Sequence, residues 1–200
     1  MNRKFLRITL IGLIALAALA SVWPAVSAGL GIKLDVKAPT TSSANAGSNQ
    51  FDRSKSRLGS CTTTHHGVTL VVDFGSSSDA QPLTVCAESS PADGWKLFKA
   101  AGVKVSGTAQ YPVGFVCRIN DYPSLADQDC EQTPTAAEGS WVYFTASAKT
   151  NFHDWRFSMV GASMNRPECG DVQGWRFVKA SDGSNTKYPR VKPEPFKCAN

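Results

Sequence analysis

The sequence predicts a single α+β domain in which one main helix packs on a mostly antiparallel sheet, stabilised by disulfides. Three observations carry this prediction. One segment with helical periodicity stands among several short β-branched or aromatic segments. Six cysteines all follow an apolar N-terminal segment. The stretch rich in these signals, residues 59–180, has the size of one domain.

The N-terminal segment has the pattern of a secretory signal peptide. It begins with three basic residues, namely Arg3, Lys4 and Arg7, and continues with an apolar run over 8–22. The small residues of Val26-Ser27-Ala28 suit a cleavage site. The apolar run is short of the roughly 20 residues that span a bilayer, which argues against a retained anchor. We therefore expect residues 1–28 to be removed, and the mature protein to be secreted without stable membrane insertion.

The net charge indicates no polyanionic partner. The formal charge of the chain is +5, and Arg3, Lys4 and Arg7 supply three of these charges, so about +2 remains after cleavage. The remaining basic residues are mostly scattered along the chain. A bias this small does not favour nucleic acid or acidic membrane surfaces as partners.

The six cysteines predict a disulfide framework, because an exported chain matures in an oxidising compartment. They are Cys61, Cys86, Cys117, Cys130, Cys169 and Cys198. Fifteen pairings are formally open; the nearest-neighbour arrangement is Cys61–Cys86, Cys117–Cys130 and Cys169–Cys198. Each short loop closed in this way stabilises the fold by roughly 3 kcal/mol. Zinc ligation is not expected, since no closely spaced C-x-x-C pair is present.

Composition divides the rest of the chain. Residues 29–58 are predicted to form a flexible spacer, because the stretch from Pro39 to Ser60 is rich in Ser, Thr, Ala, Asn and Gly and has few apolar side chains. Residues 59–180 form the predicted domain. Residues 181–200 are a polar, Pro-rich tail that Cys198 is expected to tie back to the domain.

Within the domain, one helix and several strands are expected. The helix carries Trp95, Phe98 and Ala101 at helical spacing, with Ser90 as its predicted N-cap and Gly102 at its end. The expected strands are Gly67–Phe74, Leu83–Cys86, Val103–Val105, Gly114–Ile119, Trp141–Phe144, Trp155–Met159 and Trp175–Val178.

An aromatic pattern recurs in three of these strands, namely Trp141–Phe144, Trp155–Met159 and Trp175–Val178. Because residues i and i+2 of a strand face the same way, each strand places two aromatic residues on one face. Arg156 and Arg176 then face the opposite way. Two interpretations are open. The aromatic residues pack in the core or in cross-strand pairs, or they form a partly exposed surface that stacks on a flat ligand or a sugar. The candidate ligand-binding residues are Trp141, Tyr143, Trp155, Arg156, Trp175 and Arg176.

The order of the motifs resembles a known family. The segments GVTLVVDF, the helix with Trp95, FVCRIND, WVYF, WRFSMVG and GWRFV follow one another over residues 67–178. This order is similar to the transcobalamin-like C-terminal domain of actinobacterial secreted proteins, the domain-of-unknown-function class 4430.

The resemblance implies a β-grasp-like fold, with a hairpin, a helix and further strands. It also implies a non-catalytic binding protein, which captures a cofactor such as cobalamin or another cell-surface ligand and works with a membrane uptake system. No bound cofactor is otherwise expected, although cobalamin is a candidate ligand. The large helical domain that holds much of the cobalamin in the animal proteins is absent from this sequence.

Two other function classes remain open from the residues. A secreted hydrolase is one, although no G-x-S-x-G motif and no distinct pair of carboxylates is present, so no catalytic residue is assigned. A secreted protease inhibitor is the other, with the loop 118–129 closed by Cys117 and Cys130. No metal ligand is assigned either. His65 and His66 are adjacent, and the acidic residues around Asp129 lack the glycine of a calcium loop.

Overall fold

The computed structural model describes residues 55–183 and 188–199. The predicted signal peptide and most of the predicted spacer lie outside these residues. The last residues of the 29–58 stretch form an edge strand, β1 (Ser56–Leu58), which pairs with β3. Among the described residues, no helix has the length and hydrophobicity needed to cross a membrane.

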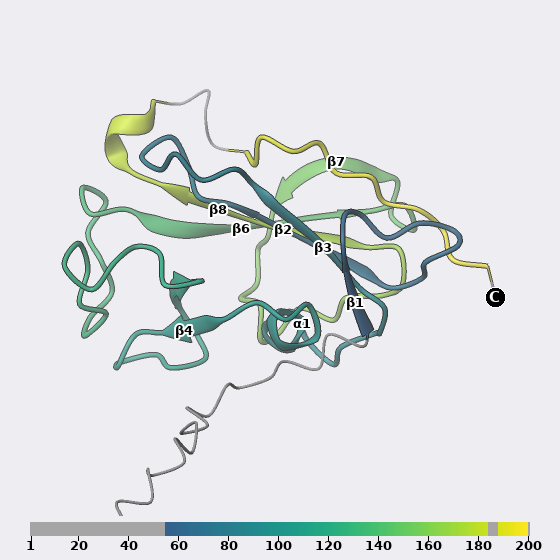
Figure 1. The fold of residues 1–200 in the computed structure, drawn as a ribbon, viewed down its shortest axis with the longest axis horizontal. Helices are drawn as coiled ribbons and strands as arrows, with labels where there is room; N and C mark the ends of the chain where they lie inside the picture. The colour runs from purple at the N-terminus through teal and green to yellow at the C-terminus, as the bar shows by residue number, and fades with distance from the viewer. Residues whose placement is uncertain (1–54, 184–187, 200) are drawn as a thin grey trace, which may run out of the picture. The chain divides into compact units, whose positions relative to one another are not determined.

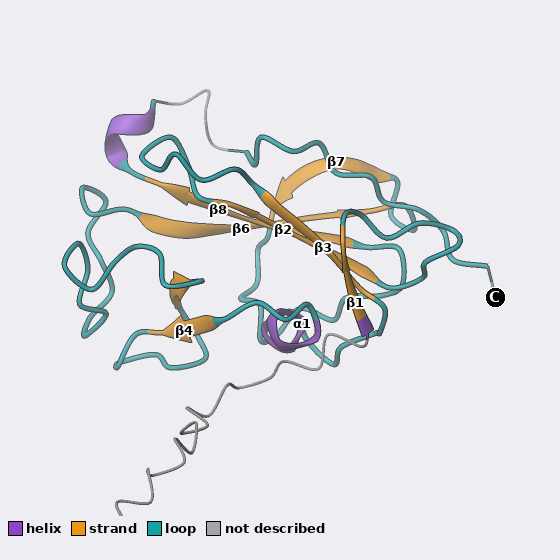
Figure 2. Ribbon diagram, in the orientation of Figure 1, coloured by secondary structure: helices purple, strands orange, loops and turns teal. Residues whose placement is uncertain are grey.

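The described residues form a six-stranded sheet, a small two-stranded sheet and one α-helix (Figures 1 and 2). The large sheet has the strand order β1-β3-β2-β8-β6-β7. Its remaining strands are β2 (Val68–Asp73), β3 (Leu83–Ala87), β6 (Ser140–Ser147), β7 (Phe152–Phe157) and β8 (Val172–Val178). The small sheet pairs β4 (Val105–Gly107) with β5 (Val116–Ile119). The helix is α1 (Gly94–Ala100), and a short 3-10 helix, η2, covers Ala180–Asp182.

The centre of the large sheet is a parallel pair. β2 and β8 lie side by side from Thr69 opposite Val172 to Asp73 opposite Arg176, and the other neighbouring strands in this sheet pair antiparallel. A hairpin, a helix and three further strands, with the first strand of the hairpin parallel to the last strand, make a β-grasp-like arrangement. The predicted α+β class, with one helix on a mostly antiparallel sheet, is confirmed.

The helix begins three residues later than the sequence indicates. Its N-cap is Asp93, not Ser90, and the Asp93 carboxylate accepts a hydrogen bond of 2.7 Å from the Lys96 amide. This bond satisfies one of the amide donors that the first turn of a helix leaves without a partner. Ser90 therefore lies outside the helix, and the aspartate directly before Gly94 caps it instead.

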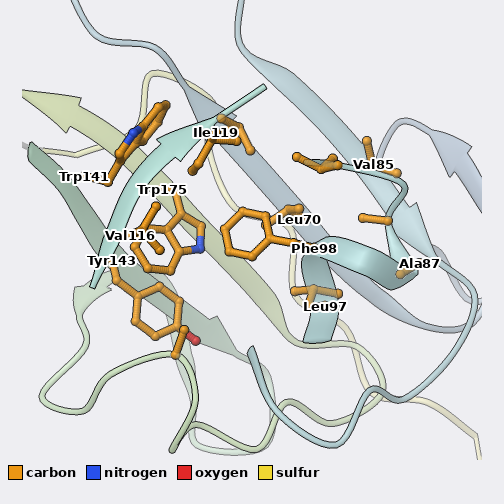
Figure 3. Packing of buried hydrophobic residues seen from close by; sticks show 14 of the residues in the cluster. Leu70, Val85, Ala87, Leu97, Phe98, Val116, Ile119, Trp141, Tyr143 and Trp175 are labelled. Atoms are coloured by element: carbon orange, nitrogen blue, oxygen red, sulfur yellow. The ribbon is translucent and has the colours of Figure 1, made fainter. Parts of the chain in front are cut away.

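The apolar core lies between the large sheet and a cover made of α1 and the small sheet (Figure 3). We call this side of the sheet the core face. Leu97 and Phe98 from α1 and Ile119 from β5 are fully buried against it. Burying a side chain of this size stabilises the fold by about 1.5–3 kcal/mol. The cover is needed because strands β2 and β8 expose mainly apolar side chains on this face.

The opposite side of the sheet, which we call the tail face, is covered by residues 188–199. Its small apolar cluster consists of Val71, Ala146 and Val172, against which Trp155 and Val191 pack. The Trp155 ring lies on the bare backbone of Gly174, where a Cβ atom would approach the ring to 2.6 Å. The Trp155 Nε1 group donates a hydrogen bond of 2.8 Å to the Val191 carbonyl. Gly174 therefore lets an indole ring tie the tail to the sheet.

A buried carboxylate holds the tail at the other end of this face. Asp73, at the end of β2, is fully buried and accepts a hydrogen bond of 2.7 Å from Arg176 of β8. Arg190 of the tail donates to the same carboxylate from its backbone amide at 2.7 Å and from its guanidinium at 2.8 and 3.0 Å. The amide of Gly75 adds a further bond at 3.0 Å. One carboxylate thus joins β2, β8 and the tail.

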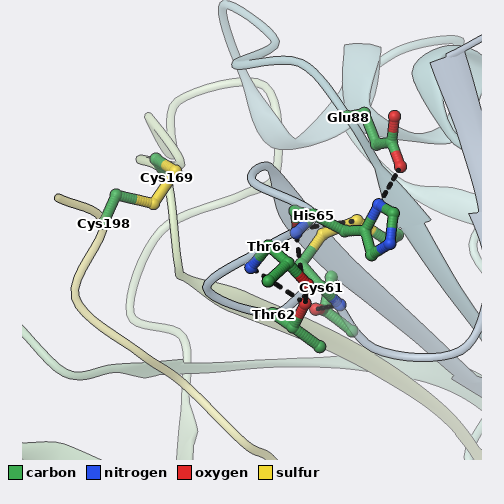
Figure 4. Close-up of a disulfide and its surroundings, with 9 residues drawn as sticks. Cys61, Thr62, Thr64, His65, Glu88, Cys169 and Cys198 are labelled. Atoms are coloured by element: carbon green, nitrogen blue, oxygen red, sulfur yellow. Dashed lines mark hydrogen bonds and ion pairs between the residues drawn. A yellow bond between two sulfur atoms is a disulfide. The ribbon is translucent and has the colours of Figure 1, made fainter.

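Three disulfides stabilise the fold, with the pairing Cys61–Cys86, Cys117–Cys130 and Cys169–Cys198. Figure 4 shows the Cys169–Cys198 bond and the surroundings of Cys61. This pairing is the nearest-neighbour arrangement expected from the sequence. The first joins the segment before β2 to β3, and the second closes the loop after β5. The third joins the tail to the segment before β8, so Cys198 does tie the tail back. Three disulfides in a chain of this size are typical of proteins outside the reducing cytosol.

We predict that Asp73→Asn destabilises the protein by about 3–5 kcal/mol, because it leaves the buried Arg176 guanidinium without a counter-charge. Urea denaturation with the disulfides intact measures this change in unfolding free energy. Asp79→Asn, an exposed position in the loop between β2 and β3, is the matched control and changes stability by less than about 0.5 kcal/mol. Equal, small losses at both positions would contradict the prediction.

The pH dependence of stability follows from the same group. Burial alone raises the pKa of Asp73, but the hydrogen bonds from Arg190 and Gly75 and the charge of Arg176 outweigh it and lower that pKa. A lowered folded-state pKa stabilises the fold above the unfolded value of about 4, and this gain is lost as the pH falls through the folded value. The stability difference between wild type and Asp73→Asn is therefore constant from about pH 7 to 5 and shrinks in stronger acid. A difference that grows on acidification would refute this assignment.

Candidate ligand-binding site

The structure distributes the six candidate binding residues over both faces of the sheet. Trp141 and Tyr143 of β6 and Trp175 of β8 come together on the core face and are almost completely buried. The Tyr143 and Trp175 rings are stacked, with centroids 4.6 Å apart and planes at 18° (Figure 3). Trp155 lies on the tail face instead. A ligand-binding role for these residues stays a prediction.

The two arginines are held apart from the aromatic group. Arg176 is buried on the tail face, where it bonds to Asp73 and donates at 3.1 Å to the Tyr188 carbonyl. Arg156 is exposed on the edge strand β7, with its guanidinium carbon 3.1 Å from the centre of the Phe152 ring. Arg176 therefore has a structural contact, and Arg156 makes a cation–π contact within its own strand.

A cleft of about 430 Å³ opens where the three buried aromatic residues meet the surface. We call it the aromatic cleft. Its base is formed by Trp141, Tyr143 and Trp175. Its walls come from α1, from the start of β5 and from the turn after β7, and include Trp95, Phe115, Val116, Met159, Val160 and Ala162. Binding sites for small molecules typically have volumes of about 300–1,000 Å³ and mainly apolar linings.

The helix start and the turn after β7 hold one another next to this cleft. The Gly94 amide donates to the carbonyls of Ala162 at 2.9 Å and Asn165 at 3.0 Å. A Cβ atom at Gly94 would lie 2.8 Å from the Tyr143 hydroxyl and 2.6 Å from Gln173 Oε1. Only glycine therefore lets the helix start so close to the base of the cleft.

The base of the cleft is uncharged. Burial raises the pKa of the Tyr143 phenol, so its hydroxyl stays protonated at any physiological pH. The indole N–H groups of Trp141 and Trp175 are buried and have no hydrogen-bond partner within the described part of the chain. Packing and ring stacking, rather than polar contacts, therefore position these two indoles.

The rim of the cleft exposes apolar side chains. Met159 is 88% exposed and Val160 is 42% exposed, and the two are neighbours in the turn that follows β7. Trp95, which the sequence places at helical spacing with Phe98 and Ala101, is half-buried and lines the cleft. Sequence reasoning missed Met159 and Val160 as surface residues. The nearest signal was Val160, where a second apolar residue after Met159 breaks the alternation of apolar and polar residues.

The residues considered for other chemistries lie elsewhere. His65 Nδ1 is 3.2 Å from the Glu88 carboxylate (Figure 4). His66 Nε2 is 2.7 Å from the Thr63 carbonyl. His66 also lies close to the sulfur atoms of Cys169 and Cys198, in a group of metal-type ligand atoms within 4.8 Å of one another. Both cysteines are used by the disulfide and so offer no thiolate.

The loop proposed for protease inhibition is folded against the domain. Its Tyr122 ring packs edge-on against Trp141 and Phe177, and Arg118 donates to the carbonyls of Pro123 and Gln128. The outermost residue is Leu125, in a tight turn where the Gln128 amide bonds to the Ser124 carbonyl. An inhibitory role for this loop also stays a prediction.

Comparison with known proteins gives one match. A family model described as the SCO2322-like domain matches residues 135–199, which contain β6, β7, β8 and the tail. The match is consistent with an actinobacterial protein, and no transcobalamin-like domain is found. No curated protein and no solved structure matches the chain.

We predict that Trp175→Ala lowers the unfolding free energy by about 3–5 kcal/mol, because it removes a large buried ring and its stack with Tyr143. Phe157→Ala is the aromatic control on the edge strand β7, at a position that is mostly exposed, and costs less than about 1 kcal/mol. Chemical denaturation measures both values. A near-neutral effect of Trp175→Ala would show that the ring contributes little to the core.

Proposed function

We propose that this is an exported, non-catalytic binding protein that holds a small, flat, largely apolar molecule in the aromatic cleft. The observation that carries the proposal is the combination of a cleft based on three aromatic rings with the exposed apolar residues Met159 and Val160 at its rim. Contiguous apolar surface next to a concave site is a mark of binding sites on exported and other water-soluble domains.

The usual occurrence of single apolar residues on a protein surface explains the exposure of Met159 and Val160 less well than ligand binding does. Single exposed apolar side chains are common on protein surfaces. Here two neighbours in sequence stand beside one cleft, and the half-buried Trp95 lines the same cleft from the helix. Methionine is flexible and polarisable, so it adapts its shape to flat ligands. Binding therefore accounts for a cluster that folding alone leaves exposed.

The lining of the cleft favours binding over hydrolysis. Among the residues that the structure describes, the lining includes two serines, Ser140 and Ser158, but no histidine, cysteine or acidic residue. A hydrolase needs a base or a second carboxylate next to its nucleophile. The chemistry that the lining offers is burial of apolar surface and ring stacking.

Cobalamin is the ligand that the family resemblance suggests, together with a membrane uptake system as partner. The size of the cleft favours a smaller molecule, because about 430 Å³ lies near the lower end of the range for drug-sized ligands. A corrin ring with its side chains exceeds that range and would contact only the mouth of the cleft. Corrinoids therefore belong in the test as competitors.

We predict saturable, micromolar binding of N-phenylnaphthylamine, an uncharged fluorescent aromatic amine, to the protein with its disulfides formed. The double variant Met159→Ser with Val160→Ser weakens binding about tenfold, because about 1–2 kcal/mol of apolar contact is lost. Fluorescence titration measures both constants, and cobalamin and related corrinoids are added as competitors.

Leu58→Ser is the matched control, since Leu58 is 78% exposed on β1, at the other end of the sheet from the strands that form the cleft. This variant should bind the amine as the wild type does. No saturable binding to the wild type would refute the proposed function. An equal loss in Leu58→Ser would show that the amine binds exposed apolar surface without regard to the cleft.

A further inference from the structure

A second cleft, of about 500 Å³, lies between α1 and the small sheet. We call it the basic cleft. Cationic side chains dominate its polar lining, and the residues that matter here are Trp95, Lys96, Lys99, Lys104, Arg118 and Asp121. Four of these six residues are positively charged and one is negatively charged. The mature chain as a whole carries only a small excess of positive charge, so this concentration is local.

Two of the cations already have carboxylate partners. Lys96 Nζ lies 3.1 Å from the Asp93 carboxylate, and Lys104 Nζ lies 3.2 Å from the Asp121 carboxylate. Both lysines are mostly exposed, so these pairs contribute little to stability. Their charges are nevertheless largely balanced.

The other two cations, Lys99 and Arg118, form no ion pair with any residue that the structure describes. Arg118 is held in place by backbone carbonyls, with Nε 2.6 Å from the Pro123 carbonyl and Nη2 bonded to that of Gln128. These contacts orient the guanidinium without neutralising it. Lys99 is exposed in the last turn of α1. The basic cleft thus contains two uncompensated positive charges, one of them fixed in position.

The two clefts meet at one side chain. Trp95 lines both the aromatic cleft and the basic cleft, and it is half-buried between them. A ring that stacks in the aromatic cleft would therefore contact a side chain that also borders the cationic lining of the basic cleft. Charge complementarity then specifies an anionic group on the same molecule.

We propose that the ligand is an aromatic anion, such as an aromatic carboxylate or sulfonate, whose ring occupies the aromatic cleft and whose negative group binds Lys99 and Arg118. This inference rests on the proposed function and narrows the ligand class. Lys99 supplies a mobile charge, and Arg118 supplies a fixed charge whose Nη1 group is left for the anion, since Nε and Nη2 donate to backbone carbonyls. The anion is retained because a charge-assisted bond adds to the stacking of the ring.

The test compares two probes that differ in one group. Anilinonaphthalene sulfonate carries the same aromatic skeleton as N-phenylnaphthylamine together with a sulfonate. Titration of the whole chain, with its disulfides formed, should show about tenfold tighter binding of the sulfonate at low salt. The advantage should decrease at high salt, because the cations are accessible to solvent ions.

Lys99→Gln should remove most of this advantage and leave binding of the uncharged amine unchanged. Lys197→Gln, which removes an exposed lysine of the tail, is the control and should keep the advantage. Near-UV circular dichroism of each variant verifies that the fold is intact, since the sulfonate also binds loosened proteins. Arg118 is left unchanged because its bonds hold the disulfide-closed loop.

Each outcome separates the two proposals. Equal binding of both probes to the wild type would overturn the anion preference and leave the aromatic cleft as the binding site. An advantage that survives in Lys99→Gln, or that disappears in Lys197→Gln, would place the anion elsewhere and also overturn this inference. Failure of both probes to bind would overturn the proposed function itself.

Discussion

The carboxylate of Asp73 joins three parts of the chain that are far apart in sequence. A single charged group in a buried position is strongly unfavourable, and it is tolerated only with good geometry and full hydrogen bonding. Asp73 meets both conditions, because Arg176, Arg190 and the Gly75 amide all donate to it. The partners come from the central strand β8 and from the tail. The parallel pair at the middle of the sheet and the cover of its tail face therefore depend on one another.

This arrangement leaves the core face free for a different task. The tail face is closed by a segment of the chain itself, and the core face is closed by α1 and the small sheet. The cover of the core face is incomplete at β6, where the aromatic cleft opens beside the turn after β7. The buried rings of Trp141, Tyr143 and Trp175 give that opening a rigid base. A rigid base reduces the entropy that a ligand loses on binding, so the packing of the core and the proposed function share the same residues.

The sequence predicted the strands well because aromatic alternation is a local property. Trp175 and Phe177 do share the core face, and Arg176 between them faces the tail. The same local pattern in β7 did not reveal that Trp155 lies on the tail face. That placement depends on register: Arg156 is opposite Thr145, so Trp155 lies on the side of Phe144. Register between strands is set by long-range packing, which the sequence of one strand does not contain.

Other parts of the site could not be predicted from the sequence, because they also depend on contacts between distant segments. The pairing of Asp73 with Arg190 joins residues separated by 117 positions, and no periodicity links them. The clefts are bounded by turns without repeating patterns, such as the one that carries Met159 and Val160. The half-burial of Trp95 likewise depends on tertiary packing, because this residue of α1 lies where the two clefts meet. The disulfides were easier to predict, because the nearest-neighbour pairing closes the shortest loops, which lose the least chain entropy on closing.

The match to the SCO2322-like domain includes the tail through residue 199. Cys169 and Cys198 both lie within the matched residues 135–199, so the disulfide that ties the tail to the domain falls inside the region of similarity.

The central parallel pair also affects how the chain acquires its structure during synthesis. β2 leaves the ribosome about a hundred residues before β8, and Arg190 follows later still. Until then, Asp73 has no counter-charge from Arg176 or Arg190 and β2 has no parallel neighbour, so its apolar side chains cannot yet be buried against β8. Contacts between such distant segments form slowly, since loop closure must precede them. The nascent chain therefore stays without its final tertiary structure for most of its synthesis, a state in which an unfolded polypeptide can be threaded through a narrow pore.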